Sequence, residues 1–231
     1  MDDVPASSSD QGSIPLHLLR LVSQGLPVGG FSYSRGLEAA VHAGWVTDEA
    51  AARDWILGTL RANVAQLDGA LFCRMALALE DGDQERFLMA NAWLAAGRES
   101  REFQREDKRQ GEALLRLLAE LDVAAARDHA GDALTFAAAF ALAGHHWRIA
   151  PEAALKGLLW VYAEGQVTAA IKLVPLGHTA GQRLLINAAT AIDEAASRAR
   201  SLRDDEVGNL APALAMASAW HETQYSRLFQ S

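Results

Sequence analysis

The pattern of apolar residues is the feature that most limits the fold. No run alternates between polar and apolar residues as a half-buried strand would. Apolar residues instead recur three and four positions apart, as Leu18, Leu21 and Val22 do within 14–24. Alanine is abundant and β-branched residues are sparse, and both favour helix over strand. The sequence therefore predicts an all-α protein.

Capping and breaking residues divide this pattern into separate helices. Thr47 or Asp48 can cap one helix, and Pro151 suits the first turn of another that reaches Lys172. The KLVP sequence ends that helix, because a residue before proline avoids the α region. Further helices are expected over 34–43, 67–80, 83–96, 98–121, 131–146 and 179–203. Short connections predict one compact bundle of about ten helices, mostly antiparallel neighbours, over residues 14–220.

Charge and composition exclude several classes of protein. The net charge of −8 disfavours binding to a phosphate backbone, so no nucleic-acid partner is expected. The longest apolar run, 133–144, is too short to span a bilayer, so no membrane association is expected. The single cysteine, Cys73, suggests a buried thiol in a reducing compartment. Residues 1–13 are polar and acidic, which predicts a disordered segment without a signal peptide and a cytoplasmic location.

A glycine-rich stretch, LPVGGFSYSRG, precedes the helix expected over 34–43. It lacks the lysine of a phosphate-binding loop and does not follow a buried strand, so neither nucleotide fingerprint is present. A tight turn is the simpler interpretation, built on Pro27, Gly29 and Gly30. Phe31 and Tyr33 stand among small polar residues there. They either pack in the core or present aromatic rings to a partner.

Charged residues are dense over 98–118. Arg98 and Glu102 are four residues apart, so the default interpretation is a solvated helix face with weak ion pairs. Three arginines at the same spacing could bind a carboxylate-rich partner: Arg101, Arg105 and Arg109. Lys172, framed by apolar residues at a helix end, either extends its ammonium group to solvent or is a partly buried charge at an interface.

The C-terminal residues 221–231, HETQYSRLFQS, are unusually rich in aromatic and apolar side chains for a chain end. Tyr225, Leu228 and Phe229 have the spacing of anchors that a helix places in a groove. This tail either folds back on its own core or becomes ordered on a partner.

No catalytic constellation is recognisable. The seven histidines show no HExxH spacing, and the chain contains no Glu-x-x-His, which argues against a carboxylate-bridged metal enzyme. No serine lies in a GxSxG motif, and no Cys–His pairing is suggested. The sequence predicts no catalytic residue, no metal ligand and no cofactor, and hence a protein that is not an enzyme.

Four motifs in order resemble the urease accessory protein F family, from about Leu16 to Ser231. They are LLRLVSQGLPVGGFSYSRGLEAAVHAGWVTD, RESREFQREDKRQGEALLRLL, KLVPLG and HETQYSRLFQS. The resemblance implies an all-helical, dimeric, non-catalytic assembly factor. Such a protein binds the D-type (or H-type) accessory protein, and together they recruit the G-type GTPase to apo-urease for nickel insertion. Whether nickel contacts this chain is left open.

The resemblance also implies which residues bind partners. The tail is expected to contact the D-type partner, and the glycine-rich turn is expected to lie on an assembly surface. Lys172 is expected to contact the GTPase, and Arg101 and Arg105 to contribute from the arginine row. The remaining expected partner-binding residues are Pro27, Gly29, Gly30, Phe31, Tyr33, His221, Glu222, Tyr225, Arg227, Leu228 and Phe229. Two alternatives remain open: direct GTPase activation through an arginine finger at Arg227 or Arg101, and an adaptor unrelated to urease.

Overall fold

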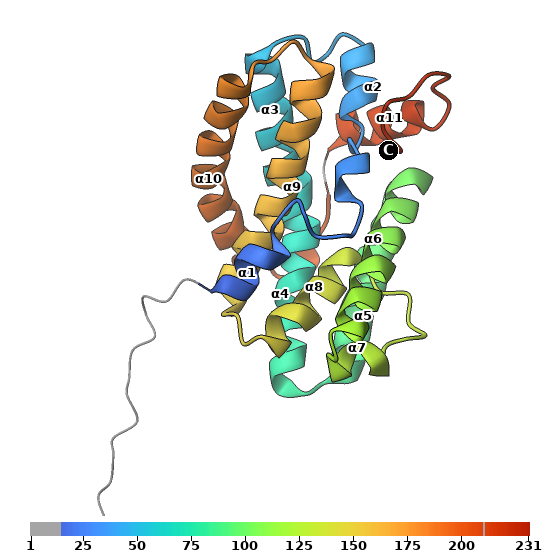
Figure 1. The fold of residues 1–231 in the computed structure, drawn as a ribbon, viewed down its shortest axis with the longest axis vertical. Helices are drawn as coiled ribbons and strands as arrows, with labels where there is room; N and C mark the ends of the chain where they lie inside the picture. Colours follow the sequence, from blue (N-terminus) through green and yellow to red (C-terminus); the bar gives the residue numbers. More distant parts are fainter. Residues whose placement is uncertain (1–14, 210) are drawn as a thin grey trace, which may run out of the picture.

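A computed structural model describes residues 15–209 and 211–231, and the regular structure within them is entirely helical (Figure 1). This confirms the predicted all-α class. The α-helices are α1 Leu16–Leu21, α2 Leu37–His42, α3 Glu49–Thr59, α4 Ala70–Asp81, α5 Gln84–Ala96, α6 Arg101–Glu120, α7 Ala124–Asp128, α8 Phe136–His146, α9 Pro151–Leu173, α10 His178–Ser201 and α11 Pro212–His221. A π-helix spans Leu60–Gly69, and short 3₁₀ turns span Gly30–Ser32 and Asp204–Glu206.

Local side-chain chemistry sets several of the helix boundaries. Of the two residues expected to cap α3, Asp48 does so, because its carboxylate accepts a hydrogen bond of 2.8 Å from the Ala51 amide. Three further helices have an N-cap side chain of the same kind: Asp83, Ser100 and Thr135. At the other end of α9, Val174 is extended before Pro175, as the KLVP sequence predicts.

The prediction of two separate helices, one starting near Asp48 and the other over 67–80, is wrong. The chain stays helical from Glu49 to Asp81, with the π-helix as its middle section. Gly69 does not break it, because its φ of −64° and ψ of −45° are helical. The five-residue helix α7 was not predicted, since so short a segment carries little periodic signal.

The core consists of two apolar clusters. The larger one lies among α4, α5, α6, α8, α9 and α10 and contains Phe72, Phe87 and Phe140. The smaller one lies at the end of the molecule that holds α2, α11 and the chain terminus, and it contains Leu37, Ile56 and Phe229 (Figure 1). The smaller cluster is therefore completed by a residue of the C-terminal tail.

Several sequence-based expectations concern features that bear little on the site. Residues 1–13 lie outside the described part of the chain. Within the described ranges, no helix combines the length and apolarity required to cross a bilayer. Cys73 is partly buried, and burial raises the pKa of its thiol to about 11, so it is a poor nucleophile.

Candidate partner-binding surface

The C-terminal tail (residues 221–231) is joined to the helical body through a buried histidine. His221 ends α11 and is fully buried between two carboxylates from different helices. Its Nδ1 lies 2.7 Å from Glu102 of α6, and its Nε2 lies 3.2 Å from Glu38 of α2. Arg227 donates to the second oxygen of Glu102 at 2.7 Å. The imidazole thus links α2, α6 and α11 at one point.

Glu38 also holds the backbone of the tail. Its two carboxylate oxygens accept hydrogen bonds from the amides of Leu228 at 2.6 Å and Phe229 at 2.9 Å. The Phe229 ring is buried in the smaller apolar cluster, with the Lys172 ammonium 5.6 Å from its centroid. A cation at this distance from an aromatic face is favourable. The tail therefore folds back on its own chain, which was one of the two expected arrangements.

The last residues of the tail contact the glycine-rich turn. The Ser34 amide donates to the Ser231 carbonyl at 2.8 Å, and the Gln230 amide donates to the Ser32 carbonyl at 2.8 Å. The Ser231 hydroxyl donates to Glu106 of α6 at 2.8 Å. Turn and tail, nearly two hundred residues apart in sequence, therefore form one continuous surface.

The exposed part of the tail differs sharply from its anchors. Tyr225 is fully exposed and Leu228 is 65% exposed, whereas Phe229 is 6% exposed. Glu222 faces inward to α6, where its carboxylate accepts a hydrogen bond of 2.8 Å from the Arg101 amide. Buried groups thus fix the tail backbone, and two apolar side chains are left in solvent.

The glycine-rich turn separates the two aromatic residues that the sequence could not distinguish. Phe31 is 66% exposed, whereas Tyr33 is buried. Gly29 adopts a left-handed φ of 73°, which explains the need for glycine there. Gly30 has no such φ and begins the 3₁₀ turn, and Pro27 is exposed beside it. The turn therefore directs one aromatic ring outward and the other inward.

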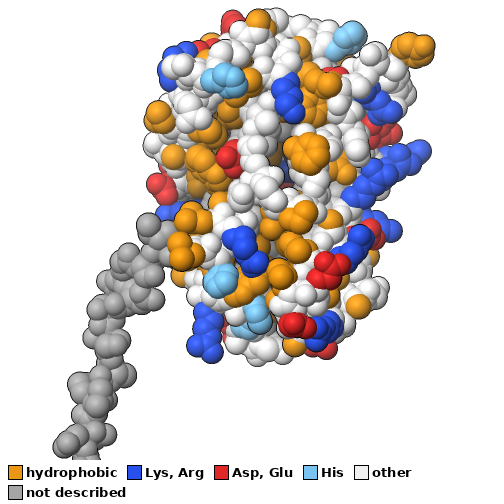
Figure 2. All heavy atoms as spheres, viewed as in Figure 1, with side chains coloured by type: hydrophobic (Ala, Val, Ile, Leu, Met, Phe, Trp, Pro, Cys, Tyr) orange, Lys and Arg blue, Asp and Glu red, His pale blue; other side chains and the backbone are white. Residues whose placement is uncertain are grey.

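Helix α6 carries the three arginines on an exposed face. Arg101, Arg105 and Arg109 are all exposed, and Arg109 donates to the Gln230 side chain at 3.0 Å. Figure 2 shows Lys and Arg side chains along the edge of the molecule where α6 lies. The row therefore borders the tail, as a positive strip on a chain whose net charge is −8.

The prediction that Arg98 and Glu102 form a weak ion pair on the surface is wrong. Arg98 is buried and donates to Asp68 at 2.6 and 3.0 Å and to Asp107 at 2.8 Å. Burial alone would raise the pKa of Asp68, but the guanidinium outweighs it and holds that pKa below its ordinary value. Asp107 also accepts from the Phe136 amide at 2.9 Å, at the start of α8. The pair was misread because residue spacing does not reveal burial.

Metal ligation is a separate question for this surface. In the part of the chain that the structure describes, no three His, Cys, Asp or Glu side chains are grouped as metal ligands. The two carboxylates nearest His221 are already occupied by donors from the protein, namely tail amides, Arg227 and the imidazole itself. The arrangement can hold a peptide segment in place, and the chemistry of its exposed side chains is suited to protein contact.

Comparison with known proteins places the chain in a family. The UreF family model matches residues 46–189, which is more than half of the chain. Urease accessory protein UreF 2 of Brucella anthropi is 58% identical over 217 residues, which cover 94% of this chain and 96% of that protein. This chain belongs to the UreF family. The resemblance found from the four sequence motifs is thereby confirmed.

Two more distant UreF proteins match over similar lengths. Urease accessory protein UreF of Alkalilimnicola ehrlichii is 42% identical over 227 residues, 98% of this chain and 100% of that protein. The Chromohalobacter salexigens protein of the same name is 39% identical over 231 residues, 100% of both chains. The matches therefore include the tail and the turn as well as the helical body.

In this UreF chain, sequence reasoning missed the residues that organise the surface. Glu38 was not singled out, and Glu102 was expected only in a weak surface pair with Arg98, because charged side chains are usually exposed. Trp45 and Trp220, both partly exposed with ring centroids 4.9 Å apart, extend the apolar surface beside the tail and were also missed. Their sequence spacing gives no signal, because α2 and α11 meet only in the folded chain.

Proposed function

We propose that this UreF family member is a urease accessory protein that acts by binding other polypeptides and is not an enzyme. With a D-type (or H-type) accessory protein, it would recruit and regulate a G-type GTPase for nickel insertion into apo-urease. The single observation that best supports a binding role is the tail, whose backbone is fixed by buried Glu38 while Tyr225 and Leu228 remain in solvent. The similarity to urease accessory proteins of other bacteria supports the connection with urease.

The tail and its surroundings have the composition of a protein interface. Aromatic residues and arginine are enriched at such interfaces, and a pre-ordered backbone reduces the entropy lost on binding. Phe31, Tyr225 and Leu228 supply exposed apolar area, and Arg101 and Arg105 supply positive charge at its border. We propose that the D-type partner covers the tail and the turn, and that an acidic surface of a partner meets the arginines.

Lys172 is the residue proposed for the GTPase contact. It is exposed, and its ammonium lies against the Phe229 ring at 5.6 Å. A contact at Lys172 would therefore adjoin the tail, and occupation of one could influence the other. The expected homodimer rests on the family resemblance and the cytoplasmic location on the composition of the sequence, and both stay predictions.

The test replaces exposed tail residues and leaves intact the buried groups that hold the tail, namely Glu38 and Phe229. The double variant Tyr225→Ala/Leu228→Ala should bind a purified D-type accessory protein at least about tenfold more weakly, because exposed anchors at an interface carry much of its affinity. Its circular dichroism and unfolding midpoint should match the wild type. Met89→Ala, an equally exposed apolar residue on α5, is the control and should bind normally. Full affinity of the double variant would contradict the proposal.

Direct activation of the GTPase is a second candidate, favoured by the exposure of Arg101 and Arg105. Arg227 is a poorer candidate for an arginine finger, because Glu102 already accepts its hydrogen bond. A finger contributes about 10³ to 10⁵ in the rate of GTP hydrolysis. Stimulated hydrolysis that falls by such a factor in Arg101→Ala, with the complex intact, would favour direct activation over scaffolding alone.

A further inference from the structure

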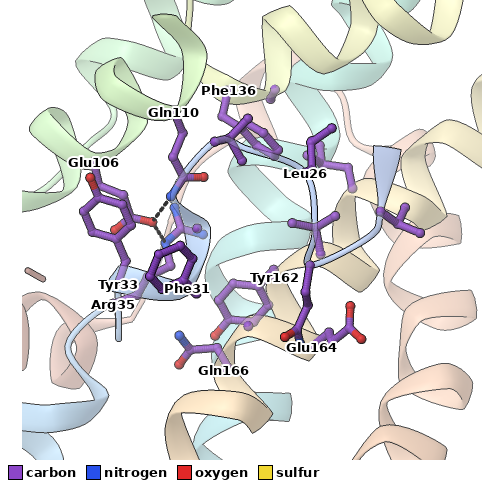
Figure 3. A pocket seen from close by; sticks show the side chains of 18 of the residues that line it. Leu26, Phe31, Tyr33, Arg35, Glu106, Gln110, Phe136, Tyr162, Glu164 and Gln166 are labelled. Carbon is purple, nitrogen blue, oxygen red and sulfur yellow. Dashed lines mark hydrogen bonds and ion pairs between the residues drawn. The ribbon is translucent and has the colours of Figure 1, made fainter. Parts of the chain in front are cut away.

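A cavity of about 100 Å³ lies beneath the glycine-rich turn, between the turn and helices α6, α8 and α9 (Figure 3). Apolar side chains such as Leu26, Phe31 and Phe136 form much of its lining. Polar side chains from other elements complete it, and the close-up shows Tyr162 and Gln166 next to each other on one wall. The cavity shares Phe31 with the turn surface assigned to partner binding above, but no residue of the tail lines it.

Two unusual backbone features border this cavity. Arg35 has a φ of 51°, a left-handed conformation that is uncommon for residues other than glycine. The π-helix Leu60–Gly69 contributes Val64 and Asp68 to the lining. Left-handed residues and π-helical segments both concentrate at functional sites, where the rest of the fold holds them in place. Their presence at one cavity indicates a constructed site rather than a packing defect.

Two buried polar atoms at the cavity have no hydrogen-bond partner among the described residues: the Tyr162 hydroxyl and the Gln166 Oε1 atom. The two side chains are 7% and 2% exposed. The Gln166 amide nitrogen is used, because it donates to the Ser34 carbonyl at 2.9 Å and so fixes the orientation of the side chain. The Thr59 hydroxyl is near Tyr162, but no hydrogen bond of normal geometry joins them. Unpartnered buried groups are costly, so a ligand that satisfies both would be favoured.

The charged residues of the lining are paired except Glu164, which is partly buried, makes no ion pair among the described residues and has its pKa raised by burial. Arg98 is balanced by two aspartates, and the Arg35 Nε atom lies 3.2 Å from Glu106. Burial raises the pKa of Glu106, which means that the cavity resists additional negative charge. Among the fully buried side chains of the lining, the groups left without a partner are therefore one hydroxyl that can donate and one carbonyl oxygen that accepts.

We propose that this cavity binds a small neutral primary amide. Its carbonyl would accept from the Tyr162 hydroxyl, its NH₂ group would donate to Gln166 Oε1, and its carbon atoms would contact the apolar lining. A dry cavity of about 150 Å³ accommodates benzene, so 100 Å³ suits a molecule of about four to six non-hydrogen atoms. The amide group belongs either to a free small molecule or to the end of an Asn or Gln side chain inserted by a partner.

The experiment measures saturation transfer by NMR from the full-length protein to acetamide. Acetate and acetone serve as matched probes, because the first adds a charge and the second lacks the donor. Acetamide should bind at least about fivefold more tightly than either. Tyr162→Phe should weaken acetamide binding about fivefold to tenfold, as expected for one lost hydrogen bond. Tyr225→Phe, the same change at a fully exposed tyrosine, should leave it unchanged.

A second arm separates the two sources of the amide. If N-acetylglutamine methylamide binds more tightly than acetamide, the natural ligand is a partner's side chain. If N-acetylglutamine methylamide does not bind, the ligand is a free amide. Equal binding of the three small probes would overturn the proposal. So would acetamide binding unaffected by Tyr162→Phe, or a crystal soaked in acetamide that shows only water between Tyr162 and Gln166. Tyr162→Phe removes no internal hydrogen bond, so the variant is expected to fold.

Discussion

Two buried charged clusters divide the molecule into a fixed part and an adjustable part. The body cluster consists of Arg98, Asp68 and Asp107, and the tail cluster consists of Glu38, Glu102 and His221. Both are almost fully removed from solvent. In the body cluster, one guanidinium satisfies two carboxylates, and all three residues belong to or adjoin long helices. In the tail cluster, two carboxylates share an imidazole and depend on donors from the last residues of the chain.

The two clusters differ in which groups supply the hydrogen bonds to their buried carboxylates. The body cluster uses only groups within the helical bundle, so we expect it to be lost only when the bundle unfolds. The tail cluster needs the amides of Leu228 and Phe229, and the neighbouring tail side chains are exposed. Local opening costs less where few buried contacts must be broken. We therefore expect the tail to open more readily than the body.

The largest effect is expected at the body cluster. Arg98→Ala would leave two carboxylates buried without their counter-charge, which costs about 3–5 kcal/mol of the free energy of unfolding. Urea unfolding followed by far-UV circular dichroism measures this loss. Arg101→Ala, an exposed arginine at the start of the next helix, is the control and should be unchanged. A loss below about 1 kcal/mol for Arg98→Ala would mean that this cluster does not hold the bundle together.

A smaller, pH-dependent effect is expected at Asp68. Because the Arg98 guanidinium lowers the pKa of Asp68 in the folded protein, the stabilisation is present above the unfolded value of 3.8 and is lost as the pH falls through the folded value. Asp68→Asn should therefore cost about 1.5–3 kcal/mol at pH 7, the range for a hydrogen bond to a charged group. Urea unfolding at a series of pH values should show the gap between variant and wild type narrowing below about pH 4. A gap that is independent of pH would contradict the assignment.

The smallest effect on global stability is expected at the tail cluster. Glu38→Gln keeps the shape of the side chain but turns an NH₂ group toward tail amides, so it should cost about 1–2 kcal/mol. Hydrogen exchange should accelerate at the amides of residues 228 and 229 and stay unchanged in α4. Glu49→Gln, at an exposed pair with Arg183, is the control and should have no measurable effect. Equal acceleration throughout the bundle would show that the two clusters are not independent.

Much of the fold could be predicted from sequence because helix signals are local. The cap at Asp48, the Pro151 start and the break at Val174 each depend on neighbouring residues alone. The continuous helix from Glu49 to Asp81 was not predicted, because its middle section is a π-helix and only packing decides whether such a stretch continues.

The site was less predictable than the fold. The sequence indicated the turn, the arginine row and the tail as candidate surfaces, but it could not tell Phe31 from Tyr33. It did not single out Glu38 and it placed Glu102 in a weak surface pair, because an acid on a helix looks the same whether solvent or a distant chain end faces it. Burial of a charge depends on what packs over it, and that information is non-local.

By itself, the sequence determined an all-helical chain, most of its helix boundaries and its place in the UreF family, because these follow from local chemistry and from motifs in order. The tertiary structure alone decided which charges are buried and where the tail lies. A carboxylate becomes an anchor only when segments far apart in sequence supply its donors, as His221, Leu228 and Phe229 do for Glu38. The free energy of burying that group comes from the whole packed environment, which no short stretch of sequence contains.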